Sequence, residues 1–205
     1  MTPPIHQPLP IVQPLHQLLT IIVQTSPLPS HPSIALLEAL FRSFDRVKGL
    51  KDCNIMILCD GCDSHEVKVL DGSKHNHGED DDEVQQTHSK PVKQRKKGKN
   101  AHNYKHGTVT QETAHNYHLY LQQLREKVNN SVPPFNSTSN GSIELLELPH
   151  RHGSAVAISA AFTILSSNDS ELGISATKYV MICQHDNFFV RDVVYLEGML
   201  EYMER

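Results

Sequence analysis

Apolar residues along this chain gather in short continuous runs, and stretches with helical spacing lie between these runs. Runs rich in Val, Ile or Leu occupy residues 18–23, 53–59 and 179–183, and each run ends at polar residues. Such runs are typical of strands that are buried on both faces of a parallel sheet. A shorter apolar run at residues 143–148 predicts a further strand.

Helical spacing of apolar residues appears in three segments, at residues 34–44, 115–128 and 192–203. An Ala-rich segment at residues 155–165 predicts a fourth, tightly packed helix. Strands that alternate with helices are typical of a parallel sheet covered by helices on both faces. The predicted fold class is therefore α/β, a three-layer α/β/α domain with a mainly parallel sheet.

The polar segments of the chain suggest where the domain begins and where it is interrupted. Residues 1–17 are rich in proline and predict a disordered leader, and residues 18–205 form the predicted single domain. A polar insertion at about 63–112 has few apolar residues, so we expect it to be disordered. It contains an acidic run at 80–83 and a basic run at 93–99. A basic run can bind nucleic acid or direct a protein to the nucleus, but a solvated loop is the simpler interpretation, and we expect no nucleic-acid partner.

Charge and cysteine usage add little specific chemistry. The formal net charge is −4 and both signs are mixed along the chain, so charge alone does not indicate nucleic-acid binding. The apolar stretch at 11–23 is broken by Pro14 and is too short to cross a bilayer, and no secretory signal is present. We therefore predict a cytoplasmic protein without a transmembrane segment. Cys59 and Cys62 have the spacing of half a zinc site or of a redox pair, but the apolar surroundings of Cys59 favour a reduced core residue.

Polar segments that contain an aspartate directly follow two of the predicted strands. Gln184-His185-Asp186 follows the run at 179–183, and Asp60-Gly61 follows the run at 53–59. Ligands of open α/β sheets bind outside the carboxyl ends of the strands. Asp186 therefore stands where a carboxylate can hold a metal ion or a substrate hydroxyl. The alternatives are a helix cap for Asp186 and a simple turn for Asp60-Gly61.

The order of these parts resembles the nucleotide-sugar half of the GT-A glycosyltransferases, and most nearly the family 2-like enzymes. A Pro/Ser/His turn at 27–33 joins the first strand to a helix, and a basic Gly-Ser turn at 149–154 leads into the Ala-rich helix. The resemblance covers residues 18–61 and 142–203. It implies a GT-A (Rossmann-like) domain that binds a nucleotide-sugar donor and transfers the sugar to an acceptor.

The resemblance also implies roles for individual residues. The end of the first strand would lie against the nucleotide, the acid that ends the second strand would contact base or ribose, and the Gly-Ser turn would lie near the donor. A solvated turn is the alternative for residues 150–152. The implied donor-binding residues are Thr25, Ser26, Asp60, Arg151, His152, Gly153, Ser154 and Gln184, and the implied metal ligands are His185 and Asp186.

The sequence departs from the family pattern at the metal motif. The family's D-x-D motif aligns with Gln184-His185-Asp186, so a neutral amide stands in place of the first carboxylate. The implied cofactor is a divalent cation, and His185 would suit Mn²⁺ better than Mg²⁺. The family's acceptor-binding half, which normally contributes the catalytic base, has no counterpart here. We therefore expect either a shortened transferase or a non-catalytic binding or scaffold protein that keeps the fold.

Overall fold

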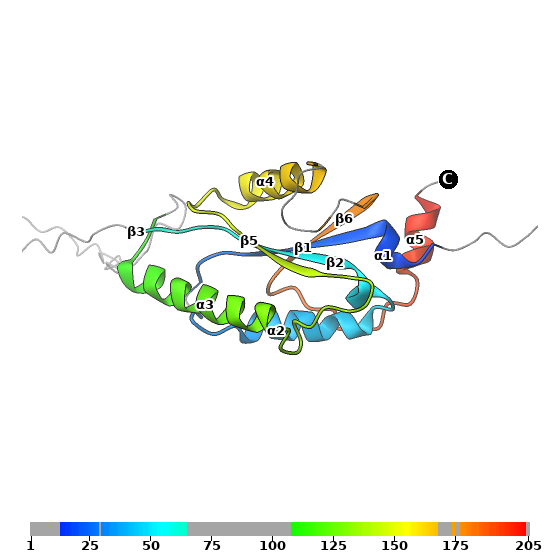
Figure 1. Cartoon of the computed structure of the whole chain (residues 1–205), viewed down its shortest axis with the longest axis horizontal. Coiled ribbons are helices and arrows are strands. Elements are labelled where there is room, and N and C mark those ends of the chain that lie inside the picture. The colour runs from blue at the N-terminus through cyan, green and yellow to red at the C-terminus, as the bar shows by residue number, and fades with distance from the viewer. Residues whose placement is uncertain (1–12, 29, 65–107, 168–173, 175–176, 204–205) are drawn as a thin grey trace, which may run out of the picture.

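The computed structural model describes residues 13–28, 30–64, 108–167, 174 and 177–203 (Figure 1). Five helices and six strands follow one another in these parts, together with two short 3-10 helices. The elements are α1 (Leu15–Leu18), β1 (Leu19–Thr25), α2 (Ala35–Ser43), η1 (Phe44–Arg46), η2 (Leu50–Asp52), β2 (Asn54–Cys59), β3 (Asp63–Ser64), β4 (Thr108–Val109), α3 (Gln111–Asn129), β5 (Ile143–Glu147), α4 (Ser154–Ser166), β6 (Tyr179–Gln184) and α5 (Leu196–Tyr202).

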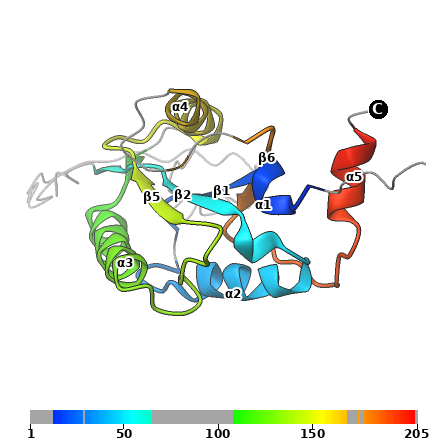
Figure 2. The same cartoon turned by 45° about the vertical axis from the view of Figure 1, so that its right-hand side comes forward.

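The main sheet has the strand order β5-β2-β1-β6, and all of its pairs are parallel. Helix α4 covers one face of this sheet, whereas α2 and α3 cover the other face (Figures 1 and 2). The predicted α/β class with a mainly parallel sheet is therefore confirmed. Strands β3 and β4 form a separate two-stranded parallel pair. No helix in the described parts of the chain is both long enough and apolar enough to cross a membrane.

Side-chain alternation along the two central strands builds the two apolar layers. On β2, Ile55 and Ile57 belong to the cluster shared with α2 and α3, and Met56 and Leu58 belong to the cluster shared with α4. Every residue of β1 is buried, as its apolar run predicted. The small side chains of α4 allow that helix to lie close to the sheet, since Ala157 and Ala161 have no exposed surface.

Strand β6 differs from its prediction as a strand buried on both faces. It lies at an edge of the sheet and pairs only with β1 among the described strands. Most of its residues are half-buried or exposed, and Ile182 keeps 45% of its surface accessible. An apolar run of this length therefore identified the strand correctly, but the run could not distinguish a central strand from an edge strand.

Two predicted boundaries also shift. Leu15 is buried and belongs to the larger core cluster, so ordered chain begins before residue 18. The predicted insertion at about 63–112 includes residues with defined structure, because Val109 is buried and α3 begins at Gln111. Residues 1–12 of the leader and residues 65–107 of the insertion, including the acidic and basic runs, lie outside the described residues.

Candidate functional site

The carboxyl ends of the four parallel strands meet at one edge of the sheet. From β1 the chain builds outward through β2 to β5, and it then returns to place β6 on the other side of β1. The strand order therefore reverses between β1 and β6, and ligands of open α/β sheets bind at such a point. Two backbone hydrogen bonds continue the sheet here, from Asp60 N to Thr25 O at 3.0 Å and from His185 N to Gln24 O at 3.1 Å.

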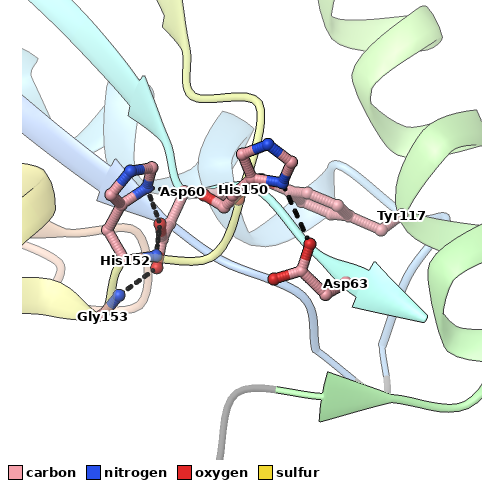
Figure 3. A network of polar contacts seen from close by, with 6 residues as sticks. All are labelled: Asp60, Asp63, Tyr117, His150, His152 and Gly153. Atoms are coloured by element: carbon pink, nitrogen blue, oxygen red, sulfur yellow. Dashed lines mark hydrogen bonds and ion pairs between the residues drawn. The ribbon is translucent and has the colours of Figure 1, made fainter. Parts of the chain in front are cut away.

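Asp60 lies at the centre of the polar network in Figure 3. Its Oδ1 accepts a hydrogen bond from His152 N at 2.8 Å, and its Oδ2 accepts one from Gly153 N at 2.9 Å. The residue is 1% exposed, so the carboxylate is held by backbone amides rather than by water. Asp60 therefore fixes the turn between β5 and α4. Its predicted contact with a base or ribose stays a prediction.

The same turn is held from two further sides. His150 Nδ1 lies 3.1 Å from Asp63 Oδ1 on β3 (Figure 3). Gly61 N donates to His150 O at 3.2 Å. The ring of His152 folds back so that its Nδ1 lies 2.6 Å from His150 O. These contacts show why the Asp60-Gly61 turn and the 149–154 turn, which are far apart in the sequence, form one structural unit.

Two tyrosines of α3 connect that helix to the same strand ends. Tyr117 donates through its hydroxyl to Asp60 O at 2.6 Å, and the Tyr120 hydroxyl lies 3.1 Å from Thr25 Oγ1. Both phenols are buried, and burial raises the pKa of both phenols. They therefore stay protonated and act as neutral hydrogen-bond donors. The sequence signal for this role was the helical spacing of Tyr117 and Tyr120, which predicted only their burial.

Replacing Tyr117 with Phe is expected to lower the free energy of unfolding by about 1 kcal/mol, because Asp60 O loses a buried donor. Urea unfolding of the variant and the wild type measures this difference. Tyr195→Phe is the matched control, since Tyr195 is 76% exposed. An unchanged midpoint for Tyr117→Phe would show that the hydroxyl adds no net stability.

His31 packs against both tyrosines. Its ring stacks on Tyr120 with a centroid distance of 4.1 Å and on Tyr117 at 5.2 Å. Its Nδ1 accepts a hydrogen bond from Leu28 N at 3.2 Å, which leaves the proton of the neutral ring on Nε2. Burial, together with the charge of His185, lowers the pKa of His31 from 6.5 to about 4. His31 is therefore neutral at physiological pH.

His185 presents an unusual buried nitrogen. Its Nδ1 lies 3.3 Å from the carbonyl oxygen of Gln24, and a carbonyl oxygen only accepts, so Nδ1 carries a proton. The residue is 8% exposed, and its Nε2 has no hydrogen-bond partner within the described chain. A buried polar atom without a partner costs about 1–3 kcal/mol. Nε2 of the neutral ring is therefore an acceptor that is suited to a ligand group or a cation.

A pocket of about 260 Å³ lies at this reversal point and contains most of the residues that the sequence implied. It is lined by Gln24, Ser26, Leu28, Asp60, Arg151, Gly153, Ser154, Gln184, His185 and Asp186. The structure therefore brings together residues from the ends of β1, β2 and β6 and from the start of α4.

Two implied residues do not line the pocket. Thr25 is buried and bonds to Tyr120, and His152 contacts Asp60 and His150. Conversely, Gln24 and Leu28 line the pocket although the sequence did not single them out. Gln24 is buried, and its Oε1 accepts a hydrogen bond from Ser154 Oγ at 2.6 Å, so it joins β1 to α4. The available signal for Gln24 was its position directly after the apolar run at 18–23.

Cys59 and Cys62, which have the spacing of half a zinc site or of a redox pair, lie at and just after the end of β2. Both thiols are free, and burial raises the pKa of both thiols, so they stay protonated. The interpretation of Cys59 as a reduced core residue agrees with its 1% exposure.

The residues of the pocket can be compared with what a divalent cation needs as ligands. In the described residues, no three or more His, Cys, Asp or Glu side chains are grouped as a complete metal site. The arrangement at His185 nevertheless fits one ligand of an open site, because its Nδ1 faces a backbone carbonyl and its Nε2 is the remaining nitrogen. Metal-binding imidazoles usually have this second contact. Asp186 is exposed beside it and lines the same pocket.

Comparisons with models of known protein families, with characterised proteins and with solved structures find no match for this chain.

Proposed function

We propose that this chain binds a nucleoside-diphosphate sugar in the pocket between β1, β6 and the start of α4, and that it transfers the sugar to an acceptor. One observation carries the proposal: residues from distant parts of the sequence, which the resemblance to GT-A glycosyltransferases selects, line one pocket. That pocket lies where the strand order of the sheet reverses.

The charges of the pocket support a ligand that arrives with a cation. Asp60 and Asp186 contribute two carboxylates, whereas Arg151 is the one Lys or Arg among the lining residues. A diphosphate in this setting needs further positive charge, and divalent cations commonly bind through one or two protein ligands together with phosphate oxygens. Arg151 supplies a guanidinium, which can pair with two phosphate oxygens at once.

His185 and Asp186 are the residues that would hold the cation. When bound, the cation would stabilise the negative charge that develops on the departing nucleoside diphosphate. The imidazole favours Mn²⁺ over Mg²⁺, because nitrogen ligands suit transition metals. The protein's own contribution is to keep the Nε2 lone pair of His185 directed away from Gln24 and to hold the turn at Gly153 through Asp60.

A second candidate function is non-catalytic binding by a protein that keeps this fold. Gln184 favours it, because a neutral amide replaces the first acid of the metal motif and its side chain is exposed. Both functions include a pocket, but only the transferase consumes a donor. Release of nucleoside diphosphate from a bound nucleotide sugar therefore separates the two.

The proposal predicts metal-dependent stabilisation by nucleotide sugars. At a ligand concentration 100 times the Kd, binding to the folded state alone adds about 2.7 kcal/mol to the free energy of unfolding. We expect UDP- or GDP-sugars with Mn²⁺ to raise the Tm of the wild type, and Asp186→Ala to lose this rise.

Asp192→Ala is the matched control, because Asp192 is 77% exposed and pairs with Arg46 rather than lining the pocket. This control should keep the full rise in Tm. Absence of any rise with all nucleotide sugars tested would refute the donor site. An equal rise for Asp186→Ala would remove Asp186 from it.

A further inference from the structure

The first turn of α4 is open to a ligand. The helix runs for 13 residues, has no side-chain cap at its start and carries no acidic residue in its first turn. The first hydrogen bond inside the helix is donated by Ala157 N to Gly153 O. The amides of residues 154–156 therefore have no acceptor within the helix.

The backbone at this turn is also accessible. Gly153 has φ of 76°, and no atom lies within 4 Å of the position that a Cβ would take there. The side chains of Ser154, Ala155 and Val156 are all exposed. A ligand can therefore approach the amides without displacing a side chain, as phosphate groups do at glycine-preceded helix starts.

An independent observation points to a ligand in the same pocket. Gly153 and Ser154 line it together with His185, whose buried Nε2 has no partner among the described residues. Ser154 Oγ also bonds to Gln24 Oε1 on β1, so the helix start is held over the reversal point of the sheet. The start of α4 at Gly153 and Ser154 and the residue with the unpartnered imidazole nitrogen thus line a single pocket.

We propose that the N-terminal turn of α4 is a phosphate subsite, in which the amides of residues 154–156 bind phosphate oxygens directly. The inference rests on the proposed function for its assignment to the diphosphate of a nucleotide sugar. One phosphate group would contact the α4 amides, and the cation at His185 and Asp186 would contact the diphosphate from the β6 side of the pocket.

The Asp60 carboxylate already lies at this turn, so only the amides of residues 154–156 are open to a phosphate group. Asp60 occupies the amides of His152 and Gly153, and its carboxylate repels an anion. Arg151 and the partial positive charge of the helix start oppose that repulsion. Direct binding should therefore be measurable without the cation and stronger with it.

Inorganic pyrophosphate is the probe that tests the subsite, measured by calorimetry in Mn²⁺ and again in EDTA. Ser154→Asp places a carboxylate beside the open amides, and Ser154→Asn places a neutral side chain of similar size there. We expect Ser154→Asp to bind pyrophosphate about tenfold more weakly than Ser154→Asn in both conditions. Both changes remove the Ser154 hydroxyl that donates to Gln24 Oε1, so the Tm of each variant is measured beside its affinity and the two variants are compared with each other.

Ser159→Asp is the matched control, because Ser159 is exposed on the same helix and lies outside the pocket. It should bind pyrophosphate as the wild type does. Equal binding by Ser154→Asp and Ser154→Asn, or no binding of pyrophosphate by the wild type in Mn²⁺, would overturn the subsite.

The outcomes separate this inference from the proposed function. If pyrophosphate binds with the expected dependence on residue 154 while no nucleotide sugar binds, the phosphate subsite stands and the transferase proposal fails. If a nucleotide sugar binds in an Asp186-dependent manner and Ser154→Asp has no effect on pyrophosphate, the transferase proposal stands and the subsite fails.

Discussion

Gly61→Ala is expected to lower the free energy of unfolding by roughly 3 kcal/mol and to abolish the proposed binding of nucleotide sugars in the pocket. A Cβ on residue 61 would lie 2.5 Å from Leu148 O and 2.6 Å from the carbonyl carbon and oxygen of His150. These are backbone atoms, so no side-chain rotation relieves the overlap. The strand end after β2 and the turn after β5 must separate, and this movement pulls the Asp60 carboxylate away from His152 N and Gly153 N.

Urea unfolding and the thermal shift with nucleotide sugars measure the two effects of Gly61→Ala. Gly198→Ala is the control, because Gly198 lies within α5 and nothing lies within 4 Å of its Cβ position. There the same change should stabilise the protein by about 0.5–1 kcal/mol through helix propensity. Wild-type stability for Gly61→Ala would show that the turns do not approach each other as described.

Acidification is expected to destabilise the protein by about 3 kcal/mol through His31 alone. The pKa of His31 is lowered from 6.5 to about 4 in the folded state, so the unfolded state binds the proton more strongly. The contribution of His31 is therefore fully present above pH 6.5, decreases as the pH falls below 6.5, and is lost near pH 4. Protonation also removes the Nδ1 acceptor of Leu28 N and places a positive charge near His185.

Urea midpoints measured between pH 7.5 and pH 4 give this dependence directly. His31→Asn keeps an acceptor near the position of Nδ1 but does not titrate, so its stability should fall less steeply over this range. His118→Asn serves as the control, because His118 is exposed on α3, and it should retain the wild-type dependence. Equal slopes for His31→Asn and the wild type would contradict the assignment.

The positions of the helices and central strands could be predicted from the sequence because their signals are local. The apolar run of β1 and the helical spacing of α2 depend on side chains within a few residues of each other. The edge position of β6 could not be predicted in the same way, since its run is as apolar as that of β1. What differs is how much of its surface other elements cover, and Ile182 remains exposed.

In the candidate site, too, some features could be predicted from local sequence and others depend on the fold. Polar residues after apolar runs marked Asp60 and Asp186, because the end of a buried strand is recognisable from sequence alone. Nothing local indicates that Asp60 accepts hydrogen bonds from residues more than 90 positions away, or that Tyr117 bonds to its carbonyl oxygen. These contacts depend on how α3 and α4 pack against the sheet.

The sequence by itself determined the alternation of strands and helices and the polar residues at the strand ends, because both follow from the periodicity of side chains along one segment. Only the tertiary structure decided which strand ends are neighbours, which histidine nitrogen is buried without a partner, and which amides at the start of α4 stay open. The physical reason is that strand order, burial and hydrogen-bond partners are set by contacts between segments that are distant in the chain.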